Sequence, residues 1–146
     1  PEAIVRINSA ENPSINEEII KNLVNDPETG VKVGLAKSPR INEESLKKLA
    51  EEENPYVRMA VAVNSKTSKD LLAKLSCDSQ KSVRSIVAMN DFTPTDILDK
   101  LAEDPEQLVR LSLLRNSKLN SEILQKLCSD PEPLVKNKAI KIKETR

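Results

Sequence analysis

A short motif recurs six times along the chain at a fixed spacing of 26 residues. Its clearest copy is Asp104 to Arg110, which reads Asp-Pro-Glu-Gln-Leu-Val-Arg. Self-similarity at such a period is the signature of a repeat architecture, in which each unit is one small assembly stacked on its neighbours. The sequence predicts a single repeat array over residues 1–146, with units 1–26, 27–52, 53–78, 79–104, 105–130 and a half unit, 131–146.

The first half of each unit is predicted to be a short helix. An Asp-Pro pair opens it at Asp26 and Asp104, with Asp as the expected N-cap and Pro at the first helical position. The apolar residues that follow lie three and four apart, which places them on one helical face. An Asn such as Asn64 ends the segment, and there we expect a left-handed residue.

Two alternatives for this first segment stay open. Residues 57–63 also alternate as a strand would, and they are rich in β-branched side chains. The Asp-Pro start and the recurring Ala favour a helix, but one so short could be α-helical or 3₁₀.

The second half of each unit has the stronger helical pattern. Asn16, Asn42 and Asn120 are predicted N-caps, and Thr67 and Thr93 resemble the first residue of a capping box. The predicted buried faces are Ile19, Ile20, Leu23 and Val24; Leu46, Leu49 and Ala50; Leu71, Leu72 and Leu75; Ile97, Leu98, Leu101 and Ala102; and Ile123, Leu124, Leu127 and Cys128.

The order of these features resembles a known family. Asp-Pro-x-x-x-Val-Arg, an Ala-rich helix, Asn, a Thr-Pro start and a Leu-Leu-x-x-Leu helix are similar to the leucine-rich repeat variant, an α-helical relative of HEAT-type repeats; residues 90–105 match best. The resemblance implies an all-α, right-handed superhelix of two-helix repeats, with one helix per repeat short and open to a 3₁₀ form. For function it implies little beyond a binding scaffold.

An acidic residue lies six positions before five of the six basic residues of the motif, all except Arg6. One interpretation is a basic track for phosphates. The other, which we favour, is a structural ladder of carboxylate–guanidinium bonds that joins neighbouring units, because each base from Lys32 onward has an acid in fixed register. The ladder comprises Asp26, Lys32, Arg58, Asp78, Arg84, Asp104, Arg110 and Asp130.

An apolar stripe follows the first helices at the second and sixth places after the Val. Helical geometry predicts that these places are exposed, and a contiguous exposed apolar patch commonly marks an interface. Alternatively, a short or 3₁₀ helix would turn the same stripe into the core. The candidate partner-binding residues are Tyr56, Met59, Val63, Met89 and Phe92.

Composition argues against catalysis. The chain has no His, two Gly and two Cys, so it offers no imidazole base, Gly-rich phosphate loop or disulfide framework. We therefore predict no enzyme activity, no cofactor and no metal site. Basic and acidic residues number 23 each, which gives no general attraction to nucleic acid or anionic membrane. No segment has the length of a membrane span, and reduced cysteines are typical of the cytoplasm.

These observations predict a noncatalytic scaffold that binds another protein through the first-helix stripe. The alternatives are a nucleic-acid-binding solenoid that uses the Arg and Lys ladder, and a spacer module of a longer protein. The sequence names neither the partner nor the oligomeric state.

Overall fold

The computed structural model describes residues 2–145. Within this range the protein has eleven α-helices and no β-strand, so the all-α prediction is confirmed and the strand alternative for residues 57–63 is wrong. The first helix of each pair is an α-helix of seven to twelve residues and not 3₁₀. The described residues fall into two compact units that meet between Leu75 and Ser76.

The helices alternate between the first and second segments predicted from the sequence. In the first unit they are α1 (Ala3–Glu11), α2 (Glu17–Leu23), α3 (Thr29–Lys37), α4 (Glu43–Leu49), α5 (Pro55–Val63) and α6 (Lys69–Leu75). In the second unit they are α7 (Lys81–Met89), α8 (Thr95–Leu101), α9 (Gln107–Leu113), α10 (Ser121–Leu127) and α11 (Pro133–Glu144).

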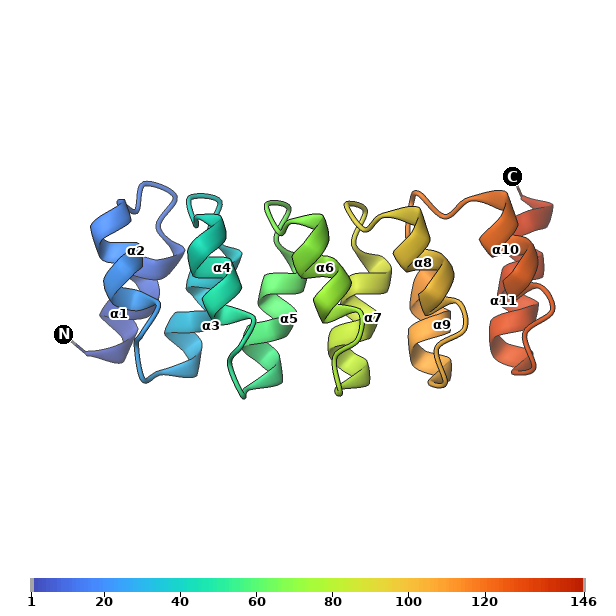
Figure 1. The fold of residues 1–146 in the computed structure, drawn as a ribbon, viewed down its shortest axis with the longest axis horizontal. Helices are drawn as coiled ribbons and strands as arrows, with labels where there is room; N and C mark the ends of the chain where they lie inside the picture. Colours follow the sequence, from blue (N-terminus) through green and yellow to red (C-terminus); the bar gives the residue numbers. More distant parts are fainter. Residues whose placement is uncertain (1, 146) are drawn as a thin grey trace. The chain divides into compact units, whose positions relative to one another are not determined.

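Helices from successive pairs pack side by side within each unit. In the first unit α3 lies between α1 and α5, and α2 and α4 each contact the first helix of their own pair and that of the next (Figure 1). In the second unit α7 packs on α9, α8 contacts both, and α11 packs on α10 and α9. A helix of seven to nine residues cannot bury an apolar face alone, so each depends on its neighbours for its core.

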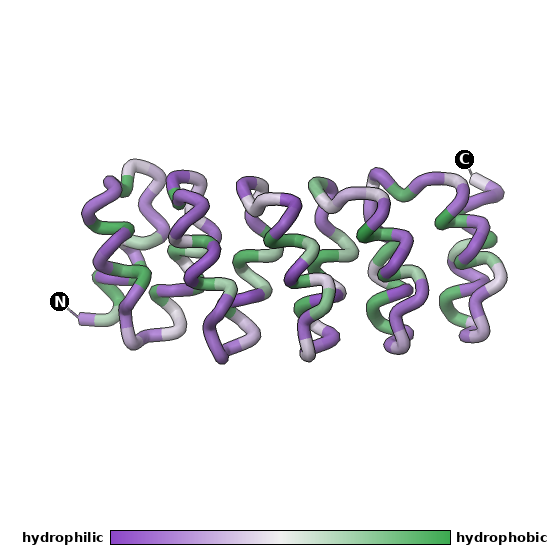
Figure 2. Tube along the Cα trace, viewed as in Figure 1, coloured by the Kyte–Doolittle hydropathy of each residue, from purple (hydrophilic) through white to green (hydrophobic). Residues whose placement is uncertain are grey.

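The core of both units is aliphatic. Figure 2 shows hydrophobic and hydrophilic residues alternating along each helix, as expected when one face of every helix is buried. Leu46, Leu72 and Leu98 on the second helices are fully buried, as predicted. Two predicted buried residues differ: Ile19 is 38% exposed and Cys128 is half-buried.

The second helices begin in two ways. Asn16, Asn42 and Asn120 are N-caps whose side-chain oxygens accept from backbone N–H groups three residues later, as predicted. The capping boxes at Thr67 and Thr93 are wrong. Their hydroxyls instead donate to the carbonyls of Val61 and Val87, at 2.5 and 2.7 Å. Each Thr therefore links the loop in which it lies to the preceding first helix.

The Asn that ends a first helix is not left-handed. Asn64 is extended, with φ −70° and ψ 130°, and no described residue has a positive φ. Its side chain explains the choice of Asn. Nδ2 donates to the carbonyls of Ala36, at 2.6 Å, and Ser38, at 3.2 Å, at the end of the preceding first helix. The same amide in Asn116 donates to Ala88 and Asn90, at 2.9 and 3.0 Å. This Asn therefore joins one helix pair to the next.

Gly34 allows α3 to approach α1 closely. A Cβ at this position would lie 3.1 Å from Cγ of Glu11 and 3.5 Å from Cβ of Ala10. Gly lowers helix propensity by about 1 kcal/mol relative to Ala. The closer contact between α1 and α3 offsets this cost.

Candidate functional site

Three of the five candidate binding residues form one strip on α5. Tyr56, Met59 and Val63 follow one another at intervals of three and four residues, so they share a helical face. Tyr56 is 67% exposed, Val63 is 55% exposed and Met59 is half-buried. Pro55 opens α5, and the side chain of Asn54 accepts from the Tyr56 N–H at 2.9 Å. The start of the strip is therefore fixed by a cap.

The other two candidates lie together in the second unit. Met89 is the last residue of α7 and is half-buried, whereas Phe92 in the following loop is 54% exposed. The Phe92 N–H donates to the Asn90 side chain at 2.7 Å, and the Lys118 ammonium lies 5.3 Å from the centre of the Phe92 ring. These contacts hold an aromatic side chain at the surface beside a cation.

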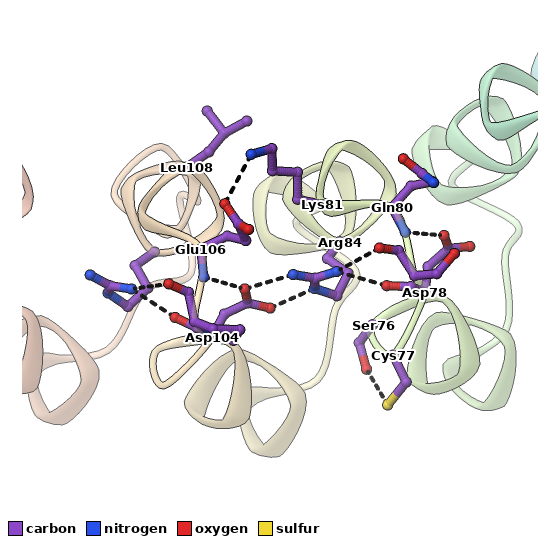
Figure 3. Close-up of polar contacts among 12 residues, drawn as sticks. Ser76, Cys77, Asp78, Gln80, Lys81, Arg84, Asp104, Glu106 and Leu108 are labelled. Atoms are coloured by element: carbon purple, nitrogen blue, oxygen red, sulfur yellow. Dashed lines mark hydrogen bonds and ion pairs between the residues drawn. The ribbon is translucent and has the colours of Figure 1, made fainter.

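The rest of the predicted stripe is less exposed. Ile7, Val33 and Leu111 are half-buried, and Ser85 is buried although the stripe pattern placed it outside. A second apolar register was missed, at the residue immediately before the repeated Val in four of the six copies. It contains Tyr56 and also Ile4, Leu108 and Leu134, which are 58, 48 and 57% exposed. Figure 3 shows Leu108 pointing away from the charged ladder. The recurrence of a large apolar residue at this place, read with the 26-residue period, was the sequence signal that could have revealed this register.

The ladder residues of the second unit bond in two directions (Figure 3). Arg84 donates from Nε to Asp104 Oδ2 at 2.6 Å and from Nη2 to Oδ1 at 2.9 Å. Its Nη1 turns back to the carbonyl of Asp78 at 2.8 Å. Arg110 repeats this arrangement with Asp130, at 2.7 and 3.0 Å, and with the carbonyl of Asp104, at 2.7 Å. Each guanidinium thus bonds to the turn before its own helix and to the Asp in the turn before the next first helix.

Ladder residues in the first unit make comparable contacts. Arg6 bonds to Asp26 at 2.6 Å and Lys32 to Glu52 at 2.8 Å. Arg58 donates from Nη1 to the carbonyls of Glu52 and Glu53, at 2.7 and 2.8 Å. Arg6, Lys32, Arg84 and Arg110 thus each pair with the acid 20 residues later. Arg58, Arg84 and Arg110 contact the backbone carbonyl of the acid six residues earlier.

The acids of the ladder are not the N-caps predicted from the sequence. Helix α3 begins two residues after Pro27, and its N-cap is Glu28. Asp26 Oδ1 accepts from the Glu28 N–H at 3.0 Å, which closes a tight turn ahead of the helix. Asp78, Asp104 and Asp130 accept in the same way from the N–H two residues later, each at 2.9 Å. Each Asp thus closes the turn with Oδ1. Asp26, Asp104 and Asp130 also accept hydrogen bonds from an Arg side chain through both carboxylate oxygens.

Pairing lowers the pKa of these carboxyls. For Asp104, burial raises the pKa, but the hydrogen bonds from Arg84 and the Glu106 N–H and the charges of Arg84 and Arg110 outweigh it. The same balance lowers the pKa of Asp130 beside Arg110. For Asp26 the hydrogen bond from Arg6 is the largest cause, and the pKa again falls below its ordinary 3.8.

We expect acid to weaken the fold through this ladder. A carboxyl whose pKa is lower in the folded state stabilises the fold fully above its unfolded pKa, here 3.8. That contribution disappears as the pH falls through the lower folded values. Thermal melts followed by circular dichroism should show a nearly constant midpoint between pH 7 and about pH 5.5, and a fall below about pH 4. The Asp104→Asn variant should be less stable at neutral pH and lose less on acidification. A midpoint that falls mainly between pH 7 and about pH 5.5 would contradict this assignment.

A hollow of about 460 Å³ lies beside the ladder in the second unit. Its charged lining includes Asp104, Arg110, Lys126 and Asp130. Lys126 bonds to Asp99 at 2.9 Å and to Glu103 at 2.7 Å, and Arg110 bonds to Asp130. Both bases in the hollow are thus ion-paired, so the surface does not present the excess of positive charge that a phosphate backbone attracts.

Residues 2–145 contain no group of three His, Cys, Asp or Glu side chains placed to hold a metal ion. No helix in the same range is both long and apolar enough to cross a membrane. Cys77 is exposed and Cys128 is half-buried, and both are free thiols.

The chain was compared with known proteins. No family model matches it, and no curated protein sequence matches it. One solved structure is similar, described as a leucine-rich repeat variant with a novel repetitive protein structural motif. The identity is 23%, the TM-score is 0.44, and the match covers 95% of this chain and 65% of that one. The paired helices and the 26-residue sequence period define the chain as a helical repeat protein.

Proposed function

We propose that this scaffold is noncatalytic and binds a partner protein through the apolar strip Tyr56, Met59 and Val63 on α5. The observation that carries the proposal is the exposure of Tyr56 and Val63 on a helix whose opposite face is fully used in the core. Leaving two large apolar side chains in water is unfavourable, and a partner that covers them recovers this free energy. Met59 between them supplies a flexible contact that adapts to a partner's shape.

Phe92 and Met89 provide a second candidate contact in the other unit. Aromatic side chains with a neighbouring cation are frequent anchors at protein interfaces, because they combine apolar area with a directed charge. The α5 strip and the patch formed by Met89 and Phe92 are independent proposals, each supported by the contacts of its own residues. The proposal thus assigns binding to exposed apolar side chains and stability to the charged ladder.

The nucleic-acid alternative has less support. Arg6, Lys32, Arg84 and Arg110 each bond to a carboxylate, which cancels charge that phosphates would otherwise neutralise. A gel-shift titration with duplex DNA at low salt provides a separate check. Binding that weakens steeply as salt rises would support that alternative.

A photo-crosslinking experiment tests the protein-binding proposal. A photoreactive amino acid placed at position 56 should capture a discrete partner in the native cell, whereas the same group at the exposed, polar Lys69 should not. The captured partner is then purified and titrated against the Tyr56→Ser/Val63→Ser variant. We expect at least about tenfold weaker binding, because a few central apolar residues carry most of the affinity of an interface.

Two control measurements make the result interpretable. The Lys66→Ser/Lys69→Ser variant changes exposed residues of the same unit and should bind as the wild type does. Both double variants should retain the wild-type circular dichroism spectrum and unfolding midpoint. Equal affinity of the Tyr56→Ser/Val63→Ser variant and the wild type would remove the α5 strip as the binding site. A chain that crosslinks to nothing from either position would favour the spacer alternative.

A further inference from the structure

The face of α1 that carries Val5 is open, although the same face is closed on the later first helices. The repeated Val is fully buried at Val31, Val57, Val109 and Val135, each 0% exposed, whereas Val5 is 50% exposed. Within the first unit the contacts explain the difference. The helix α3 packs on α1 and α5 packs on α3, so Val31 and Val57 each have a preceding first helix to meet. In the described residues no such helix stands before α1.

The second helix of the first pair shows the same opening. Ile19 on α2 is 38% exposed, whereas the residues in the same register, Ser45, Leu71, Ile97 and Ile123, are 2 to 6% exposed. Terminal repeats that end an array in water carry a polar outer face. Here Val5 and Ile19 place apolar side chains on that face instead, so it has the composition of an interface between repeats.

Asn12 supplies independent evidence, because it is built like the Asn residues that join one pair to the next. Its side-chain oxygen accepts from the Ser14 N–H at 2.8 Å, as that of Asn64 accepts from Lys66 at 2.9 Å. In Asn64 and Asn116 this turn aims Nδ2 at two carbonyls of the preceding first helix. Asn12 is exposed, and no described residue accepts a hydrogen bond from its Nδ2.

We propose that the open face formed by Val5, Asn12 and Ile19 docks one further helical repeat of the same construction, joined to the chain before α1. Such a repeat covers the two apolar side chains and offers the Asn12 amide two backbone carbonyls at the end of its first helix. The amide is specific for this occupant, because the two acceptors must lie two residues apart at a helix end, as Ala36 and Ser38 do for Asn64.

The C-terminal end of a second copy does not offer the same acceptors. In register, the carbonyls would be those of Ile140 and Ile142 on α11. That helix does not end there, because it continues to Glu144. The Ile142 carbonyl already accepts from the Thr145 N–H, at 3.3 Å, and from its hydroxyl, at 3.0 Å. The occupant is therefore a repeat within the same chain and not the end of another molecule.

A fusion of one repeat to the whole chain tests the proposal. A second copy of residues 79–104 is placed directly before residue 1. This junction restores the Asp-Pro pair, because Asp104 then precedes a Pro. The added Ala88 and Asn90 fall 28 and 26 residues before Asn12, the same separations as in the Asn116 contacts.

Hydrogen exchange followed by mass spectrometry reads the result. We expect amide exchange in α1 and α2 to slow by about tenfold or more in the fusion, because their exposed side chains become covered. Val5→Ala should hardly change exchange in the parent chain but should reverse most of the protection in the fusion. Asn12→Ala should do the same, whereas Leu108→Ala, an exposed control in the other unit, should leave the protection unchanged.

Two outcomes would overturn the proposal. An added repeat that leaves exchange in α1 and α2 unchanged, in a fusion whose other helices keep their protection, would show that the face does not take a repeat. The second outcome comes from analytical ultracentrifugation of the parent chain. Self-association that disappears in Val5→Glu would assign the open face to a second copy.

Discussion

The Arg110→Ala variant is expected to lose about 3 kcal/mol of unfolding free energy, the lower end of the cost of breaking a buried ion pair by removing one partner. Arg110 is 8% exposed and Asp130 is 7% exposed, so the carboxylate left behind has little access to water. The guanidinium also donates to the carbonyls of Asp104 and Pro105, at 2.7 and 3.2 Å, and these acceptors lose a partner as well. The neighbouring hollow admits some water, which is why we expect the lower end of the range.

The loss is measured by urea denaturation followed by circular dichroism. Arg110→Lys keeps the charge but cannot reach both oxygens of Asp130 and the two carbonyls together, so an intermediate loss is expected. Lys100→Ala removes an exposed cation from the same unit and should change the free energy by less than about 0.5 kcal/mol. If Arg110→Ala were as stable as Lys100→Ala, the ladder would not join neighbouring helix pairs. The interpretation of the basic residues as a ligand-binding track would then regain weight.

The charged ladder was predictable in composition but not in connectivity. Each base from Lys32 onward follows an acid by six residues, at the same helix start. The structure pairs Arg84 with Asp104, 20 residues later. Only the stacking of one helix pair on the next brings these two groups together. The spacing of residues within one 26-residue repeat does not predict a contact between neighbouring repeats. The same reason explains why the Asn64 bonds to Ala36 and Ser38 were missed.

Local patterns predicted the helices more fully than their ends. Periodicity of three and four identified the buried face of α5 and the Asn caps of α2, α4 and α10, because these depend on residues within one helix. Thr67 and Thr93 were misread, since a hydroxyl near a helix start has several backbone partners within reach and the loop decides among them. Burial of the apolar stripe depended on how neighbouring helices cross, so the half-buried states of Met59 and Met89 had no signal in the sequence.

The Leu35→Ala variant is expected to lose about 3 kcal/mol of unfolding free energy, within the range for deleting a buried Leu side chain. Leu35 is 0% exposed and lies on α3, the helix that contacts both α1 and α5. Truncation leaves a cavity where neighbouring aliphatic side chains lose their contacts. Because short helices are stable only when stacked, one cavity in α3 should weaken α1 and α5 as well.

Leu108→Ala provides the matched control, since it removes the same atoms from a first helix where the side chain is 48% exposed. It should cost less than about 1 kcal/mol, because little cavity forms at the surface. Urea denaturation gives both free energies, and hydrogen exchange locates the damage, which we expect over α1, α3 and α5. Equal losses in the two variants would mean that Leu35 is not held in a packed core. Faster exchange confined to α3 would contradict the dependence of each helix on its neighbours, which is the physical basis of a stacked repeat.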